Sequence, residues 1–330
     1  MKIFDKPLIV ITGGAGFIGS SLVRHLNNQG VCDILIVDDL GTGNKWKNLI
    51  GKSFVDLISR HDLFHWLSEH DAGDIQAFVH LGACSSTQEC DVDYLMENNF
   101  RFSVRLAEYA LRNNHRMIYA SSASCYGSGK YGYSDDHEKL ALPRPQTAYA
   151  YSKQLFDLWL RDREVLNQVV GLRFFNVFGP NEWHRGVTRS VPTKAIETVQ
   201  KEGVLKLFKS PNPDLYGDGE QKRDLIYVKD AVRMIAAFLS NDATGIYNIA
   251  SGTPQSWNSV ASAVFQALSK PYQVEYIDPP KDMSMQSQAE VCADMQKTRK
   301  ALGEAVSRTM SLESAIKDYI SFHLDSDHTW

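Results

Sequence analysis

Runs that are apolar at nearly every position alternate with longer runs of helical period through the first half of the chain. Uninterrupted apolar runs are typical of parallel strands that are buried on both faces. We expect strands at Leu8–Ile11, Ile34–Val37, Ser53–Val55, Ile75–His80, Arg116–Ala120 and Gln168–Arg173. Strands that alternate with helices at regular spacing predict a Rossmann-type α/β fold with a doubly wound parallel sheet.

This alternation stops after Arg173. The chain continues with a helix and shorter strands between polar loops, expected at Val191–Val199, Leu205–Phe208, Arg223–Val228, Gly245–Ala250 and Val274–Ile277. We therefore predict a dinucleotide-binding domain at residues 1–173 and a smaller, discontinuous substrate-binding domain at residues 174–223 and 253–330. The segment 224–252 is expected to return to the first domain.

A glycine-rich turn follows the first expected strand. The sequence Thr12-Gly-Gly-Ala-Gly-Phe-Ile-Gly19 contains G-x-G-x-x-G and leads from that strand into a helical pattern. Glycines here permit a tight turn and close approach to a pyrophosphate, and the helix N-terminus offers free N–H groups to the phosphates. We predict a dinucleotide site with contacts from Gly13, Gly16, Phe17, Ile18 and Gly19.

The end of the second expected strand carries candidate ligands for the adenosine ribose. Asp38 stands about 20 residues after the last glycine, where an acid contacts both ribose hydroxyls and favours NAD. Lys45 lies a short loop later and is able to bind the 2′-phosphate of NADP, so the sequence leaves NAD versus NADP open here. Further cofactor contacts are expected from Asp39, Asp56, Leu81, Ala83 and Asn99.

Tyr149 and Lys153 form a candidate proton-transfer pair. They stand four residues apart at the start of a helical run and therefore share one helix face. A neighbouring cation favours the phenolate, so we expect the tyrosine pKa to fall below its usual value of ~10. Such a tyrosine can take a proton from a sugar hydroxyl while a nicotinamide takes the hydride. Ser122, just after an expected strand, is predicted to hydrogen bond the same sugar oxygen.

Composition narrows the class of protein. The 330 residues, 43% apolar and 22% charged, suit a globular chain of about two domains. The net charge of -4 gives no reason to expect a nucleic acid or an anionic membrane as a partner. Five cysteines without C-x-x-C spacing argue against disulfides and a zinc site. Since we also find neither a signal peptide nor a long apolar run, we expect a cytoplasmic protein without a bound metal.

These motifs together resemble the extended short-chain dehydrogenase/reductase superfamily of nucleotide-sugar epimerases and dehydratases. The similarity covers nearly the whole chain, through T-G-G-x-G-F-I-G, D-D-L, S-S-A, Y-x-x-x-K, R-F-F-N-V-F-G-P and R-D-x-I-Y-V. Within it, residues 80–87, 96–100 and 181–186 are most similar to the family of ADP-glycero-manno-heptose 6-epimerases, which serve lipopolysaccharide core biosynthesis. The resemblance implies an isomerase that acts on ADP-heptose and forms a homo-oligomer.

The resemblance also implies a mechanism. A tightly held NADP removes hydride from C6 of the heptose and returns it to the opposite face, which requires an acid/base on each side of the carbon. Tyr149 resembles the first, and the second is a lysine in the family where this chain has Arg185. Because arginine is a poor base, we consider His184 or a water held by Arg185 for that role. Substrate contacts are implied for Ser85, Ser122, Asn176, His184, Arg185, Phe208 and Arg223.

Two other functions use the same fold. A UDP-hexose 4-epimerase shares Ser122, Tyr149 and Lys153, whereas a non-catalytic dinucleotide sensor has no need of them. A dehydratase is disfavoured, because such enzymes need an acid pair after the strand-end hydroxyl and the sequence after Ser122 reads Ala-Ser-Cys.

Overall fold

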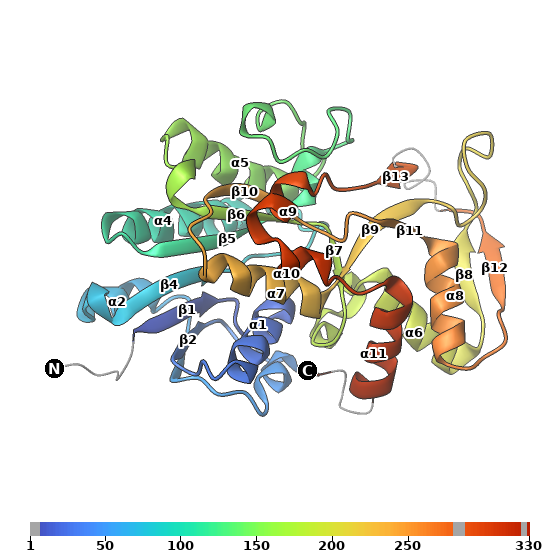
Figure 1. The fold of residues 1–330 in the computed structure, drawn as a ribbon, viewed down its shortest axis with the longest axis horizontal. Coiled ribbons are helices and arrows are strands. Elements are labelled where there is room, and N and C mark those ends of the chain that lie inside the picture. Colours follow the sequence, from blue (N-terminus) through green and yellow to red (C-terminus); the bar gives the residue numbers. More distant parts are fainter. Residues whose placement is uncertain (1–6, 280–287, 325–328) are drawn as a thin grey trace.

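A seven-stranded parallel sheet forms the centre of the molecule (Figure 1). The computed structural model describes residues 7–279, 288–324 and 329–330. In spatial order the strands are β10 (Gly245–Ile249), β6 (Val170–Phe174), β5 (Arg116–Ser122), β4 (Ile75–His80), β1 (Leu8–Thr12), β2 (Ile34–Val37) and β3 (Asp56–Ile58). This order confirms the predicted Rossmann-type fold. It reverses between β1 and β4, where open α/β sheets bind ligands beyond the carboxyl ends of the strands.

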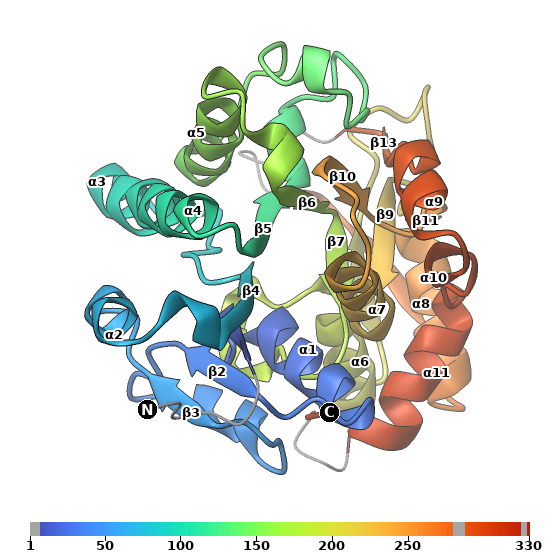
Figure 2. The ribbon, with the colours of Figure 1, turned by 60° about the vertical axis from the view of Figure 1, so that its left-hand side comes forward.

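Helices cover both faces of the sheet, as Figure 2 shows. Successive strand residues point to opposite faces, so Ile9 packs in one apolar cluster and Leu8 in another. The first cluster includes α1 (Phe17–Asn28) and α7 (Val228–Leu239), and the second includes α2 (Leu63–Glu69), α4 (Phe102–Arg112) and α5 (Ala148–Asp162). Because both faces are buried, the strands are apolar at almost every position, as their sequence indicated.

A smaller set of strands and helices packs beside this sheet, on the right in Figure 1. Strands β7 (Asn176–Phe178), β9 (Lys222–Tyr227), β11 (Pro254–Ser256) and β13 (Glu290–Val291) form one sheet, and β8 (Leu205–Phe208) pairs with β12 (Val274–Ile277). The helices of this part are α6 (Val191–Glu202), α8 (Trp257–Ala267) and α11 (Leu312–His323). Helices α9 (Gln296–Leu302) and α10 (Glu304–Ser307) instead pack against α7 at the central sheet. Apolar residues of α6, α8 and α11 bury one another in a third core cluster.

The helical region between β4 and β5 is interrupted. Helix α3 (Val92–Leu95) is followed by a π-helical turn (Met96–Arg101) before α4 begins. Such a turn carries one extra residue and is frequent at functional sites. Here it directs Asn99 inward, where its side chain is 1% exposed.

The third strand of the sheet lies three residues later than predicted, so the expectation of a strand at Ser53–Val55 was wrong. The main-chain N–H and carbonyl of Ser53 are both bonded by the Asn27 side chain. These groups are therefore not free for a sheet ladder, and pairing with β2 starts at Asp56.

The two sheets divide the segment 224–252, which was expected to return to the first domain. Strand β10 lies at the edge of the seven-stranded sheet. Strand β9, whose residues 224–227 also belong to this segment, instead pairs with β7, β11 and β13. The domain boundaries themselves stay a prediction. Among the described residues, no helix is both long and apolar enough to cross a membrane.

Candidate active site

A cavity of about 680 Å³ opens at the carboxyl ends of β1, β4, β5 and β6. Most of the residues predicted to bind cofactor or substrate line it. They are Gly13, Gly16, Phe17, Ile18, Gly19, Asp38, Lys45, Leu81, Ala83, Ser85, Ser122, Tyr149, Lys153, Asn176, His184 and Arg185. The structure thus brings together, from segments far apart in sequence, the groups that dinucleotide-dependent sugar chemistry requires.

The glycine-rich turn has no room for side chains. Gly13 has a φ of +70°, and a Cβ there would lie 2.7 Å from the main-chain nitrogen of Gly82. A Cβ on Gly19 would lie 2.1 Å from the carbonyl oxygen of Gly13. Helix α1 begins after Gly16 without a side-chain cap, so its first N–H groups are free to meet an anion in the cavity. This cradle fits the pyrophosphate of a dinucleotide.

Acidic and basic side chains lie close together at the carboxyl end of β2. Asp38 accepts hydrogen bonds from the main-chain nitrogens of Ala15 (2.9 Å) and Asp39 (2.8 Å) and from Nζ of Lys45 (2.5 Å). Lys45 therefore partly neutralises the Asp38 carboxylate beside the position expected for the ribose. Asp38 and Lys45 also line an adjoining cavity of about 220 Å³, together with Asp39 and Arg60.

Arg60 is a candidate cofactor residue that the sequence interpretation missed. Its guanidinium lies 2.7 Å from the carboxylate of Asp39, which also accepts from the Ser59 hydroxyl at 2.8 Å. Burial opposes ionisation of Asp39, but these two partners outweigh it and lower the pKa of that carboxyl. Both Ser59 and Arg60 follow β3, so placing that strand correctly would have revealed them.

Tyr149 lies in the first turn of α5, where the Thr147 side chain caps the helix. The Ser122 hydroxyl interacts with the phenol and favours its ionised form, while the predicted bond from Ser122 to a sugar oxygen stays a prediction. Burial raises the pKa of Tyr149 to about 12, although the Ser122 bond and the charge of Arg185 both lower it. The expectation of a pKa below the usual value was therefore wrong in the protein without ligands, because burial disfavours the phenolate more than these groups favour it.

Lys153 lies one turn further along α5 and is 6% exposed. Burial lowers the pKa of its ammonium to about 8, and the neighbouring charge of Asp157 opposes this shift. A group with that pKa is still mostly protonated at pH 7. Lys153 therefore supplies a positive charge to the floor of the cavity.

Asp157 continues the series Tyr149–Lys153–Asp157 at intervals of four residues on α5. Its carboxylate is fully buried and accepts from Nη2 of Arg173 (2.9 Å), the Tyr119 hydroxyl (2.9 Å) and the Ser121 hydroxyl (2.8 Å). These donors come from β5 and β6, so the ion pair fastens the catalytic helix to the strand ends that carry Ser122.

The loop after β7 brings two more groups to the cavity. Nδ1 of His184 lies 3.1 Å from the Asn48 amide, and the imidazole is also bonded to the main chain of Asn181. Burial, together with the charges of Lys45 and Arg185, lowers the pKa of His184 to about 4, so it is neutral at pH 7. The guanidinium of Arg185 lies 5.7 Å from the ring centre of Phe17.

Five predicted residues do not line this cavity: Asp39 lines only the adjoining one, and Asp56, Asn99, Phe208 and Arg223 line neither. Asp56 begins β3, so it lies at the amino end of a parallel strand, away from the ligand edge, and its carboxylate bonds its neighbour Leu57. This position gives no support to the cofactor contact expected from Asp56, which stays a prediction. Asn99 lies behind the cavity, where it bonds Cys84 and the Ser152 hydroxyl.

Arg223 and Phe208 lie in the smaller part of the molecule. The Arg223 guanidinium donates to the carbonyl oxygens of Lys222 and Gln288, while Phe208 is half-buried at the end of β8. Neither contacts the cavity that holds Tyr149, so their predicted substrate contacts receive no support from its lining.

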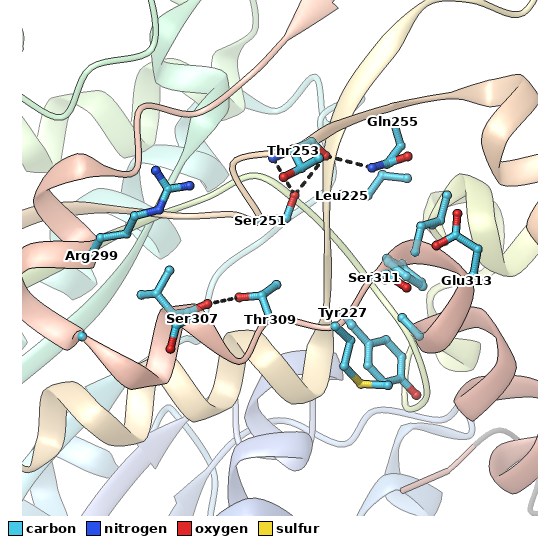
Figure 3. Close-up of a pocket in the computed structure, with 16 residues that line it drawn as sticks. Leu225, Tyr227, Ser251, Thr253, Gln255, Arg299, Ser307, Thr309, Ser311 and Glu313 are labelled. Carbon is cyan, nitrogen blue, oxygen red and sulfur yellow. Dashed lines mark hydrogen bonds between the residues drawn. The ribbon is translucent and has the colours of Figure 1, made fainter.

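A separate cavity of about 540 Å³ lies between the second sheet and helices α10 and α11 (Figure 3). None of the predicted site residues line it. Its hydroxyl groups are engaged locally, since Ser251 bonds the Thr253 carbonyl and Thr309 bonds that of Val306. The cavity that contains Tyr149 is therefore the candidate active site.

Known proteins share this arrangement. Residues 9–250 match the NAD dependent epimerase/dehydratase family. The chain is 44% identical over 319 residues to the ADP-L-glycero-D-manno-heptose-6-epimerase of Nitratidesulfovibrio vulgaris, covering 96% of this chain and 98% of that relative. The Helicobacter pylori ADP-L-glycero-D-manno-heptose-6-epimerase matches with a TM-score of 0.79 at 27% identity, covering 97% of this chain and 98% of the other. Thermus thermophilus UDP-glucose 4-epimerase in complex with NAD matches with a TM-score of 0.72 at 26% identity, again covering 97% and 98%.

The fold and the site define a nucleotide-sugar epimerase, an isomerase built on a dinucleotide-binding sheet. The chain belongs to the NAD dependent epimerase/dehydratase family. Within that family its similarity to ADP-L-glycero-D-manno-heptose-6-epimerases, inferred above from three short segments, is confirmed over nearly the whole chain.

Proposed function

We propose that this protein converts ADP-D-glycero-D-manno-heptose into ADP-L-glycero-D-manno-heptose by transient oxidation at C6, with NADP as the cofactor. The observation that carries the proposal is the 44% identity to a relative of that name across 96% of this chain. Such coverage includes the segments after Arg173, which contribute the sugar end of the cavity, as well as the dinucleotide-binding strands.

The cofactor assignment rests on the residues around the ribose position. The glycine-rich turn would hold the pyrophosphate, and Lys45 and Arg60 would hold a 2′-phosphate. Asp38 repels a phosphate less than a free carboxylate does, because Lys45 bonds it. Bound NADP would supply a hydride acceptor and, in its oxidised form, a positive charge near the reacting carbon.

Tyr149 acts as the acid/base on one face of C6. In its ionised form, Tyr149 takes the proton from the sugar hydroxyl and becomes a phenol, while the Ser122 hydroxyl holds the same oxygen. The influence of Ser122 on the ionisation of Tyr149 supports this arrangement. Because burial raises the pKa of Tyr149 to about 12, proton removal depends on positive charge nearby. Lys153 and Arg185 provide that charge from two sides.

Arg185 serves the opposite face of the carbon. A guanidinium keeps its proton, so it binds the ketone oxygen and holds a water rather than acting as a base. We favour this water over His184 for moving the second proton, because an imidazole with a pKa of about 4 is a weak base. Full activity of His184→Ala would support the water, whereas a large loss in kcat would favour the imidazole.

The decisive experiment is proton NMR of the purified protein with NADP and ADP-D-glycero-D-manno-heptose. Appearance of the L-glycero epimer supports the proposal. Turnover of UDP-galactose without conversion of the heptose would instead favour the second candidate, a UDP-hexose 4-epimerase. The similarity to the Thermus thermophilus UDP-glucose 4-epimerase is the observation that favours this candidate. Binding of NADP without turnover of either sugar would favour a dinucleotide sensor. A homo-oligomer stays a prediction, testable by light scattering on the same sample.

A further inference from the structure

Two buried asparagines join the glycine-rich turn to the loop that carries His184 and Arg185. Asn48 is 3% exposed and Asn181 is fully buried. The amide nitrogen of Asn48 lies 3.0 Å from the carbonyl oxygens of both Ala15 and Asn181, and 3.1 Å from Nδ1 of His184. A single amide therefore contacts the turn assigned to the pyrophosphate and the loop assigned to the sugar.

Asn181 extends this connection to helix α1 and to the end of the sequence. Its amide nitrogen lies 3.0 Å from Oγ of Ser20 and 3.1 Å from Oγ of Ser21, so it faces two hydroxyls of the helix that follows the turn. Its Oδ1 accepts from the main-chain nitrogen of Trp330 at 2.6 Å. Asn181 also has a φ of +74°, a conformation that asparagine tolerates better than most residues.

The Glu182 side chain holds the far end of the loop, at Ser190 and Thr193. Glu182 is fully buried and accepts from the main chain and hydroxyl of Ser190 and from the hydroxyl of Thr193, at the start of α6. Between this anchor and Asn48 lie the half-buried Arg185 and the exposed Val187. The asparagines thus provide the attachment on the dinucleotide side, where displaced amides would leave buried polar groups unpaired.

We propose that Asn48 and Asn181 are positioning residues that hold loop 183–189 against the glycine-rich turn, so that Arg185 faces Tyr149 across the cavity. This inference rests on the site described under Proposed function. Tyr149, Ser122 and Lys153 lie on β5 and α5 and do not depend on the clamp. Loss of either asparagine therefore displaces the group on one face of the sugar carbon and leaves the other face intact.

The test compares Asn48→Ala and Asn181→Gly with a matched control, Asn27→Ala. Glycine at 181 keeps the positive φ without strain, so its effect comes from the lost amide together with the greater backbone freedom of glycine. Asn27 bonds the carbonyls of Val31 and Ser53 and the N–H of Ser53 at the far end of α1, remote from the loop. It therefore reports what losing a comparable set of hydrogen bonds does to stability.

The first readout is limited trypsin digestion with mass spectrometry, which follows cleavage after Arg185 and needs neither cofactor nor substrate. We expect both clamp variants to be cut there at least ten times faster than the wild type and Asn27→Ala, with cleavage after the exposed Arg308 unchanged. The second readout is turnover, where we expect kcat to fall about tenfold in the clamp variants and to stay unchanged in Asn27→Ala.

The outcomes separate the inference from the proposed function. If cleavage after Arg185 in the clamp variants matches that of Asn27→Ala, the positioning role is wrong, whatever the substrate. Faster cleavage with unchanged kcat would also overturn it, because the loop would then be free without consequence for the chemistry. If no nucleotide sugar is turned over by the wild type, the digestion still decides whether the clamp holds the loop.

Discussion

Replacing Asp157 by asparagine should destabilise the protein strongly while leaving its shape almost unchanged. Asp157 and Arg173 are 0% and 1% exposed, so the substitution leaves a buried guanidinium without its counter-charge. Breaking a buried ion pair from one side costs about 3–5 kcal/mol in the free energy of unfolding. With an unfolding entropy of about 2.1 cal/mol/K per residue, 330 residues give about 0.7 kcal/mol/K, so Tm should fall by about 4–7 °C.

The assay is urea denaturation followed by circular dichroism, with calorimetry for Tm. Asp162→Asn is the matched control, because Asp162 is also on α5 and pairs with Arg161, but on the surface, where an ion pair contributes about 0–1 kcal/mol. The double variant Asp157→Leu with Arg173→Met removes both charges and should recover part of the loss. If Asp157→Asn costs no more than Asp162→Asn, the buried pair does not fasten α5 to the strands as argued here.

Three further outcomes are expected. Tyr149→Phe should lower turnover by at least about a thousandfold, because it removes a positioned acid/base. NADP binding, measured by fluorescence titration, should be retained. Substantial turnover by this variant would exclude tyrosine-based oxidation. Lys45→Ala and Arg60→Ala should each raise the Kd for NADP about tenfold and leave that for NAD within twofold, and an equal change for both would refute a 2′-phosphate contact. Burial lowers the pKa of His80 to about 3, so between about pH 6.5 and 3 the unfolded chain binds a proton that the folded chain does not. The free energy of unfolding should therefore fall as the pH drops from about 6.5 toward 3, by up to about 1.4 kcal/mol per pH unit. Urea midpoints measured against pH test this, and His80→Gln should give a flatter profile than the wild type.

Local sequence patterns were sufficient to predict those parts of the fold and site that are determined by contacts between residues close together in the sequence. The apolar runs located β2 and β4 to the residue, and the glycine spacing located a turn where a Cβ on Gly19 would meet a carbonyl oxygen. The four-residue spacing of Tyr149 and Lys153 placed both on α5. In each case the determining contact is made within a few residues of the one that was interpreted.

The errors have a common physical origin in contacts between distant segments. The shift of β3 arises from Asn27, which occupies the main chain of Ser53, and it hid Arg60 from the sequence interpretation. The raised pKa of Tyr149 depends on how much surface the fold removes from water, which spacing along a helix does not report. Asn48 and Asn181 are 133 positions apart, so only the folded chain shows that one amide bonds the other's main chain.

The charges around position 185 bear on why this chain can use arginine where the family resemblance implies a lysine. A base at this position would need to lose its proton. The neighbouring imidazole shows how this region disfavours positive charge, because burial, followed by the charges of Lys45 and Arg185, lowers the pKa of His184 to about 4. A guanidinium stays protonated in such surroundings, and its charge lowers the pKa of Tyr149 across the cavity. Under the proposed mechanism, Arg185 therefore favours proton removal on the opposite face at all times, whereas a lysine would do so only while it is protonated. Under the proposed mechanism, Arg185 thus keeps electrostatic assistance to Tyr149 in place, and a water moves the proton on its own side.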